Sequence, residues 1–192
     1  MAKKATTVLI AGAVIVLMLI GGIAWYVGQR NSLIALDESV NGAWSEVDNQ
    51  LQRRSDLIPN LVSTVQGFAS QEQQVFSDIA DARARLAGAQ TVSETAEGYE
   101  RMESALSRLL VVVEAYPELR SNQNFLRLQD ELAGTENRVA VARQRYNSSV
   151  QTYNARIRMF PASLLAGSLG MTAREYFEVD ESVRTVPEVN FD

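Results

Sequence analysis

An uncharged apolar run near the N-terminus limits the possible folds of this chain more than any other feature. Residues 6–28 read TTVLIAGAVIVLMLIGGIAWYVG. As a helix rising 1.5 Å per residue, these 23 residues would be roughly 34 Å long, enough to cross a hydrocarbon core of about 30 Å. Trp25 and Tyr26 stand at its C-terminal end, where amphipathic rings favour the level of the lipid headgroups. The run therefore predicts a transmembrane helix.

A cleaved signal peptide is the alternative interpretation of this run. Signal peptides have apolar cores of about 7–15 residues and a small-x-small cleavage site. This run is longer and ends in Ala24-Trp25-Tyr26, so an uncleaved anchor is favoured. Lys3 and Lys4 precede the run, and the positive-inside rule then predicts that residues 1–5 are cytoplasmic and that the rest is exported.

Apolar residues recur at helical spacing after the run. The first series has steps of three and four and comprises Leu33, Leu36, Val40, Ala43, Val47 and Leu51. No cluster of glycine or proline separates this series from the apolar run, so one continuous helix is expected. Proline lacks an N–H group and disfavours the helical region for the residue before it, so Pro59 predicts a kink or break. A second helix is expected from there to about Ala87.

Two further long helices are predicted in the second half of the chain. Thr91-x-x-Glu94 fits a capping box that opens a helix ending at Tyr116-Pro117. The next helix has coiled-coil spacing over Phe125, Leu128, Leu132, Thr135, Val139, Ala142, Tyr146, Val150, Tyr153, Ile157 and Phe160. A short helix is expected over Ala162–Ser168 and another after Thr172.

These patterns predict one architecture, because no strand period of useful length occurs. The fold is expected to be all-α, with the transmembrane helix of residues 6–28 continuing into an antiparallel bundle of three to four long helices over residues 29–160. Short helices and an acidic tail are expected over residues 161–192.

Composition excludes several classes of function. Cysteine and histidine are both absent, which removes disulfides, thiolates, the commonest general base and the commonest metal ligand. The formal net charge is −5, and the two lysines lie before the apolar run, so the remainder is more acidic still. Acidic domains bind nucleic acid poorly, because affinity rests on neutralising phosphates. We therefore expect a non-enzymatic protein with no catalytic residues, metal, cofactor or nucleic-acid partner.

A column of polar residues follows the last long series of apolar positions. Glu136, Arg143, Asn147 and Asn154 each come directly after an apolar position of that helix, about 100° around its axis. Such side chains are half-buried and can reach neighbouring helices. A hydrogen-bonded layer that fixes helix pairing is one interpretation, and a ligand or ion site is the other.

A second polar group surrounds the expected break at Pro59. Arg53, Arg54, Asp56 and Asn60 lie within reach of the backbone groups that a broken helix would leave without partners. They could satisfy those groups as caps, or the stretch could be a hinge or a corner for docking a partner. Both interpretations stay open at the level of sequence.

Several short motifs occur in order between Trp44 and Phe177. They are Ala43-Trp44-Ser45-Glu46-Val47, Arg53-Arg54-Ser55-Asp56-Leu57-Ile58-Pro59-Asn60, Glu114-Ala115-Tyr116-Pro117-Glu118-Leu119, Thr135-Glu136-Asn137-Arg138, Arg143-x-x-Tyr146-Asn147, Val150-x-x-Tyr153-Asn154 and Phe160-Pro161. Together they resemble the LemA family of bacterial envelope proteins. The resemblance adds Glu114 and Asn137 to the candidate site residues.

Two positions depart from the family pattern. The family usually shows Tyr-Asn before its first helix, where this chain has Arg30-Asn31, and often His-Glu where this chain has Gln71-Glu72. The resemblance implies one N-terminal transmembrane helix and a helical bundle in the bacterial envelope. With the orientation that Lys3 and Lys4 predict, we expect the chain in the bacterial cytoplasmic membrane with its bundle on the periplasmic side. It also implies kinship with a protein that helps to build magnetosome membranes, and an association with membrane-bound zinc proteases.

Two hypotheses for function follow. The first is an envelope scaffold that self-assembles into a homo-oligomer larger than a dimer, with Trp44, Phe68 and Phe76 as candidates for an exposed aromatic interface. The second is an adaptor that presents clients to a membrane protease. The lipid bilayer is an expected partner in both.

Overall fold

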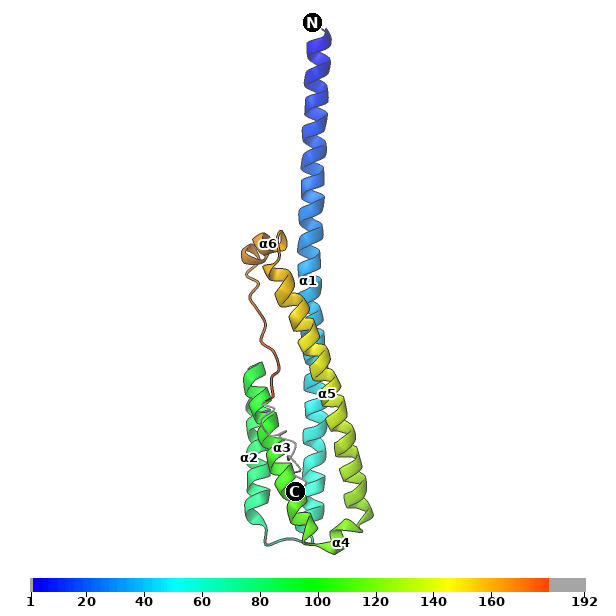
Figure 1. The fold of residues 1–192 in the computed structure, drawn as a ribbon, viewed down its shortest axis with the longest axis vertical. Coiled ribbons are helices and arrows are strands. Elements are labelled where there is room, and N and C mark those ends of the chain that lie inside the picture. The colour runs from blue at the N-terminus through cyan, green and yellow to red at the C-terminus, as the bar shows by residue number, and fades with distance from the viewer. Residues whose placement is uncertain (1, 180–192) are drawn as a thin grey trace, which may run out of the picture. The chain divides into compact units, whose positions relative to one another are not determined.

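The computed structural model describes residues 2–179, and within that range the chain is all-α, as predicted. No strand occurs among these residues. The helices are α1 (Ala2–Gln66), α2 (Gln73–Gly88), α3 (Val92–Glu114), α4 (Pro117–Arg120), α5 (Gln123–Arg158) and α6 (Ala162–Ser168) (Figure 1).

The chain divides into two compact units, and α1 and α5 contribute to both. Unit 1 combines Met1–Asn41 with Ser149–Arg174, and unit 2 combines Gly42–Ser148 with Glu175–Asp192. Unit 1 contains the apolar run and α6, whereas unit 2 contains α2, α3 and α4. We describe the two units separately.

Unit 2 is built around one apolar core. Each of its five helices contributes to that core: Ile58, Leu61 and Val65 from α1, Phe76 and Ile79 from α2, Met102 and Leu109 from α3, Leu119 from α4, and Phe125, Leu128 and Leu132 from α5. Full burial of side chains of this size contributes about 1.5–3 kcal/mol each. Of these residues, Phe125, Leu128 and Leu132 were predicted as apolar positions of one coiled-coil series, and all three lie in the core.

The hairpin of α2 and α3 depends on one glycine. The chain reverses direction between these helices (Figure 1), and Gly98 of α3 lies against Leu86 of α2. A Cβ atom at Gly98 would lie 2.9 Å from the Leu86 Cα atom, closer than non-bonded carbons approach. A residue without a side chain is therefore required where the two backbones meet.

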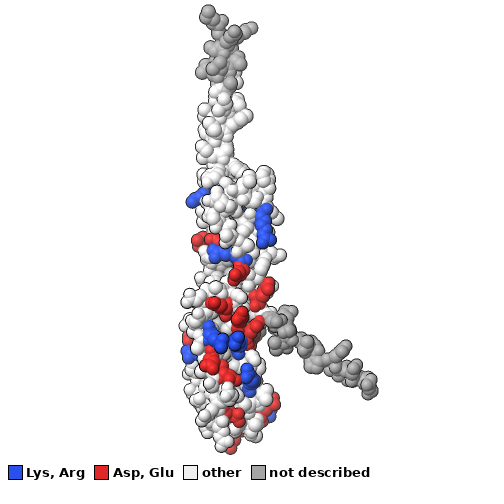
Figure 2. Space-filling view, turned by 90° about the vertical axis from the view of Figure 1, so that its left-hand side faces the viewer, with Lys and Arg blue, Asp and Glu red and all other residues white. Residues whose placement is uncertain are grey.

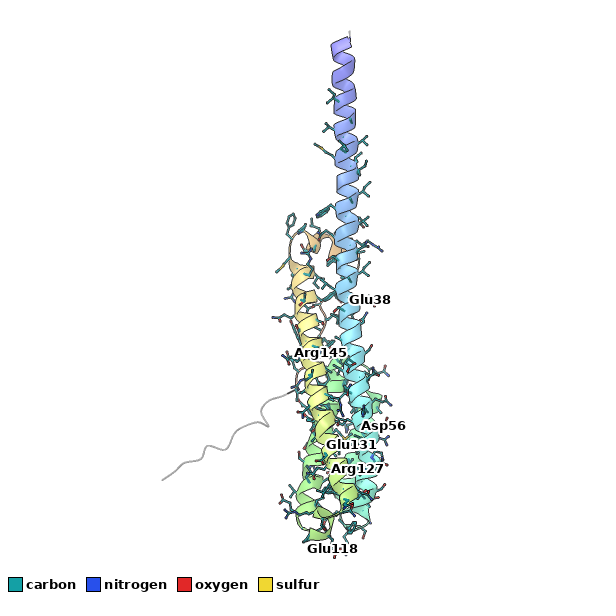
Figure 3. All side chains as sticks on the ribbon, turned by 90° about the vertical axis from the view of Figure 1, so that its right-hand side faces the viewer. Glu38, Asp56, Glu118, Arg127, Glu131 and Arg145 are labelled. Atoms are coloured by element: carbon teal, nitrogen blue, oxygen red, sulfur yellow. The ribbon has the colours of Figure 1, made fainter. Side chains whose placement is uncertain are left out.

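Charged residues cover the outside of unit 2. Asp56 on α1, Glu118 on α4, and Arg127 and Glu131 on α5 are all exposed (Figure 3). The apolar positions face inward and the charged positions face solvent, which is the pattern of an amphipathic helix packed in water.

A kink or break was predicted at Pro59, and the break is wrong. α1 includes Pro59 and continues to Gln66. Proline inside a helix costs about 3 kcal/mol, but its neighbours Ile58 and Leu61 are each 1% exposed and belong to the core. Burial on both sides of the proline offsets that cost. The helix ends instead before Gly67, and α2 begins at Gln73.

The capping box predicted at the start of α3 is confirmed. The Thr91 hydroxyl accepts a hydrogen bond from the Glu94 N–H at 3.1 Å, and the Glu94 carboxylate accepts one from the Thr91 N–H at 3.3 Å. These reciprocal bonds satisfy amides that a helix start leaves without partners. The boundary of α3 was therefore predictable from four residues of sequence.

The C-terminal part of the chain follows the predictions in part. The helix over Ala162–Ser168 is confirmed as α6. The expected helix after Thr172 is absent as far as residue 179, because residues 171–179 form an irregular stretch, hereafter the C-terminal segment. The predicted acidic tail beyond it lies outside the described residues. Phe160, expected in the core, is 80% exposed, because α5 ends at Arg158.

The three aromatic residues predicted as an exposed interface differ in burial. Phe76 is 9% exposed and belongs to the core, whereas Phe68 is 40% exposed. The Trp44 ring packs 5.1 Å from the Tyr146 ring and 6.1 Å from the Phe177 ring, measured between centroids. Phe68 alone of the three keeps a largely open apolar surface.

Candidate functional site

The N-terminal part of α1 presents an apolar surface on which no described residue packs. Its large apolar side chains from Ile10 to Val27 are 43–71% exposed, and Figure 2 shows this stretch as an uncharged surface. Among the described residues, this is the helix that is long and apolar enough to cross a membrane. Exposed apolar surface of this extent marks a site of interaction.

A buried arginine, Arg54, is the centre of a polar cluster in unit 2, hereafter the arginine node. Its Nε donates to Glu103 Oε1 at 2.8 Å, and its Nη2 lies 2.7 Å from the same oxygen and 3.1 Å from Glu136 Oε2. Its Nη1 donates to the Leu132 carbonyl oxygen at 2.7 Å and to the Thr135 hydroxyl at 3.1 Å. One guanidinium thereby joins α1, α3 and α5.

Two carboxylates, Glu103 and Glu136, share this one cation, and the pKa of Glu103 is shifted. Burial raises the pKa of Glu103 from 4.5 to about 7, the Arg54 charge opposes the rise, and the Glu136 charge adds to it. Burial and the two carboxylates also raise the pKa of Tyr99, so its hydroxyl stays protonated and donates to Glu136 Oε2 at 2.7 Å. The node can therefore hold an extra proton near neutral pH.

A hollow of about 210 Å³ adjoins the arginine node. Arg54, Glu103 and Glu136 line one part of it, and leucines of α1, α3 and α5 line much of the rest: Leu61, Leu106, Leu110 and Leu132. Because the guanidinium already binds two carboxylates, it has no free charge to offer an anionic ligand. The geometry supports a role in joining helices more than a role in binding a ligand.

In unit 1, Asn154 binds the backbone of the C-terminal segment. Its Nδ2 donates to the Arg174 carbonyl oxygen and its Oδ1 accepts from the Arg174 N–H, both at 2.8 Å. The Tyr153 hydroxyl donates to the Thr172 carbonyl oxygen at 3.1 Å. Burial raises the pKa of Tyr153, and the nearby Asp37 charge raises it further. The hydroxyl therefore stays a donor.

Unit 2 repeats this arrangement with Tyr146 and Asn147. Asn147 Nδ2 donates to the Phe177 carbonyl oxygen at 3.0 Å, and its Oδ1 accepts from the Phe177 N–H at 2.9 Å. The Tyr146 hydroxyl donates to the Glu175 carbonyl oxygen at 2.8 Å. The Phe177 side chain is 1% exposed, with its ring 6.2 Å from the Tyr99 ring.

The spacing of the two Tyr-Asn pairs explains how one helix can bind successive parts of the segment. The pairs are seven residues apart on α5, and their partners are three residues apart on the C-terminal segment. Seven helical residues cover about 10.5 Å, and three extended residues cover about 10 Å. Seven residues of the helix and three residues of the extended segment therefore cover nearly the same distance.

The members of the predicted polar column contact different parts of the structure. Asn147 and Asn154 contact the C-terminal segment, not neighbouring helices. Glu136 does reach other helices, through Arg54 of α1 and Tyr99 of α3. Arg143 is half-buried on α5. The column thus divides between the arginine node and the Tyr-Asn pairs.

Two groups of candidate site residues remain, those around Pro59 and those taken from the family motifs. They do not form one site. Of the group around Pro59, Arg54 is buried, whereas Arg53, Asp56 and Asn60 are exposed on α1. The candidates taken from the motifs alone, Glu114 and Asn137, are also exposed.

Sequence reasoning missed Glu103, Tyr99, Tyr146 and Tyr153 as members of these sites. A signal for Arg54 existed, because it stands three residues after Leu51 and four before Ile58 and so occupies a core position. The repeated Tyr-Asn dipeptide at a spacing of seven was the signal for the pairs. No comparable pattern pointed to Glu103.

Metal chemistry finds no support in the described residues. No group of three or more Asp or Glu residues among them is arranged to hold a metal ion. Glu103, the pKa of which is raised to about 7, binds Arg54.

Comparison with known proteins identifies relatives over most of the chain. Residues 43–191 match the sequence profile of the LemA family. Magnetosome protein MamQ 2 of Paramagnetospirillum magneticum is 26% identical over 189 residues, which cover 85% of this chain and 70% of that protein.

Two further relatives agree with that match. Magnetosome protein MamQ of Magnetospirillum gryphiswaldense is 26% identical over 191 residues, covering 86% of this chain and 70% of that protein. Protein LemA of Metamycoplasma hominis is 23% identical over 161 residues, covering 83% of this chain and 73% of that protein. Both Tyr-Asn pairs and the arginine node lie within the matched residues 43–191.

Proposed function

The chain belongs to the LemA family, and on this premise we propose that it is a non-enzymatic, membrane-anchored scaffold that assembles from several copies. One observation carries the proposal: α1 joins an uncovered apolar stretch to a well-packed helical part within a single helix. Large aliphatic residues near the centre of a membrane helix each favour insertion by about 0.3–0.6 kcal/mol. The whole stretch therefore supports a stable anchor.

Anchoring favours self-assembly for a physical reason. Copies that cross the same bilayer share a plane and an orientation, so they lose less freedom on association than copies in solution. Repeated side-by-side contacts between identical rods can close into a ring or a cap. Two of the relatives are magnetosome proteins, and the part in building magnetosome membranes that the family resemblance implies for one relative supports a role in membrane organisation.

The exposed apolar residues of unit 2 offer candidate contacts between copies. Phe68 lies between α1 and α2 and is 40% exposed. We propose that the interface involves this end of α1 and α2. Val141 on α5 has a similar exposure of 47% and provides a matched position elsewhere.

Analytical ultracentrifugation of the full-length protein in mild detergent tests the assembly. We expect a particle of several times 21.2 kDa, weakened by Phe68→Ser and retained in Val141→Ser. Deleting residues 1–28 should also weaken it, because the shared plane is lost. A monomer or dimer at micromolar concentration would refute the scaffold and leave the protease adaptor as the better hypothesis.

The proposed topology places the N-terminus in the cytoplasm and the helical part in the periplasm, since Lys3 and Lys4 precede the apolar run. An alkaline phosphatase fusion after Asp192 should be active and a fluorescent protein at the same site should be dim. The reverse pattern would mean that the small charge bias does not set the orientation.

A further inference from the structure

The turn between α5 and α6 exposes an unusual amount of apolar surface. Met159, Phe160 and Leu164 are 56%, 80% and 68% exposed, and Phe160 is the most exposed large apolar side chain among the described residues. We call residues 159–164 the apolar corner. Three large apolar side chains grouped within six residues require a cover.

The apolar corner lies beside the end of the apolar run, within unit 1. Arg156 Nη2 donates to Gln29 Oε1 at 2.7 Å, and Gln29 directly follows the run, which ends at Gly28. α5 continues for two residues past Arg156 and then enters the corner. Figure 1 shows α6 next to α1 at this level. The corner is therefore placed at the boundary of the proposed membrane span.

The charges around the corner suit a phospholipid surface. Arg30, Arg156 and Arg158 lie close to this boundary, and residues 149–173 contain no acidic residue. The nearest acidic residue after the run on α1 is Asp37, and it pairs with Arg174 at 2.8 Å. Apolar side chains next to unopposed guanidinium groups are the combination that binds the headgroup region of a bilayer.

We propose that the apolar corner inserts into the headgroup layer of the same bilayer that α1 crosses. This inference rests on the proposed membrane anchor. Phe160 and Leu164 enter the boundary between headgroups and acyl chains, and the nearby arginines contact lipid phosphates. Attachment at two points fixes the rotation of α1 about its own axis, so every copy presents the same face to its neighbours.

Because the chain contains no cysteine, single cysteines provide a direct test. We would label Phe160→Cys, Leu164→Cys, Gln151→Cys and Leu17→Cys with a nitroxide in the full-length protein. The matched control, Gln151, is exposed on α5 nine residues before Phe160, roughly 13 Å away along the helix. Leu17 lies in the middle of the apolar run and reports on the anchor itself.

The measurement is electron paramagnetic resonance power saturation in vesicles of phosphatidylethanolamine and phosphatidylglycerol. Oxygen concentrates in lipid, whereas a nickel chelate stays in water. We expect the ratio of oxygen to nickel accessibility at positions 160 and 164 to exceed that at position 151 severalfold and to stay below that at position 17, which lies deeper in the bilayer.

The outcomes separate the inference from the proposed anchor. If position 17 is in lipid but positions 160 and 164 match position 151, the anchor stands and the corner does not insert. Protection of positions 160 and 164 from both reagents would mean that protein covers the corner, which also overturns the inference. If position 17 itself is in water, the proposed anchor fails.

Discussion

The arginine node and the Tyr-Asn pairs both join distant parts of the chain, but they use different chemistry. The node buries a cation between two carboxylates, with Arg54 only 6% exposed. The pairs use neutral amide and hydroxyl groups that bind backbone atoms. The first arrangement depends on charge and on which side chain stands at each position, whereas the second is largely independent of the sequence it binds.

The two kinds of contact suit different tasks: the buried ion pairs fix helices against each other, and the backbone hydrogen bonds hold an irregular segment. A guanidinium with five donors fixes three helices in one geometry, and the removal of one member leaves charges without partners. An amide that pairs with a backbone N–H and C=O holds an irregular segment whose own polar groups would otherwise lack partners. We therefore expect the node to be more sensitive to substitution and to pH than the pairs.

The largest effect is expected from Arg54→Ala. This change leaves Glu103 and Glu136 without their cation, and loss of one partner from a buried ion pair costs about 3–5 kcal/mol. Because the carboxylate side chains are 32% and 39% exposed, we expect a loss near 3 kcal/mol in urea unfolding. Arg53→Ala, at the exposed neighbouring position, should change stability by less than about 0.5 kcal/mol. Equal effects of the two changes would show that the node does not stabilise the fold.

An intermediate effect is expected from Asn154→Ala. The variant leaves the N–H and C=O of Arg174 without their partner, which costs about 1–3 kcal/mol. The C-terminal segment should also become more sensitive to limited proteolysis. Asn137→Ala, exposed on the same helix, serves as the control and should leave both readouts unchanged. Unaltered proteolysis in Asn154→Ala would mean that the amide does not hold the segment.

The pH dependence distinguishes the two arrangements more finely. The pKa of Glu103 is about 7 in the folded protein against 4.5 ordinarily, so the folded state binds more protons between these values. Its contribution to stability is therefore present below pH 4.5, falls as pH rises to about 7, and is level above. Glu103→Gln should flatten this part of the profile in thermal unfolding, whereas Asn154→Ala should retain the slope. A profile that is identical in the parent and in Glu103→Gln would contradict the raised pKa.

The smallest effect is expected at an exposed ion pair. Arg108 and Asp78 lie 2.6 Å apart, with the arginine side chain 60% exposed. Exposed pairs contribute about 0–1 kcal/mol and are screened by salt. Asp78→Asn should therefore change urea unfolding by less than about 1 kcal/mol, and less again at high salt. A loss as large as that of Arg54→Ala would show that burial does not explain the difference between the two ion pairs.

Much of the fold was predictable because its signals are local. The capping box placed the start of α3 at the correct residue, and the spacing of apolar residues selected core positions such as Val47, Leu132 and Val150. The prediction at Pro59 failed because the energy that proline costs inside a helix is smaller than the energy gained by burying Ile58 and Leu61. Phe160 misled because the apolar spacing continues past Arg158, where α5 ends.

The sites were less predictable, because their partners are far apart in the chain. Asn154 and Arg174 are 20 residues apart, and Arg54 and Glu136 lie on different helices. The apolar residues of the C-terminal segment show no regular spacing, so its sequence does not predict that it binds α5. The repeated Tyr-Asn dipeptide indicates which helix supplies the side-chain hydrogen bonds, but it does not indicate which segment receives them.

By itself, the sequence determined the all-α class, the start of α3, the apolar run and the absence of cysteine and histidine, since each follows from neighbouring residues or from composition. Only the tertiary structure decided that Arg54 pairs with Glu103 and Glu136, that α1 passes through Pro59, and that the Tyr-Asn pairs hold the C-terminal segment. The physical reason is the same in each case. Burial and hydrogen-bond partners depend on which distant residues meet, and their energies exceed the local preferences that a sequence pattern records.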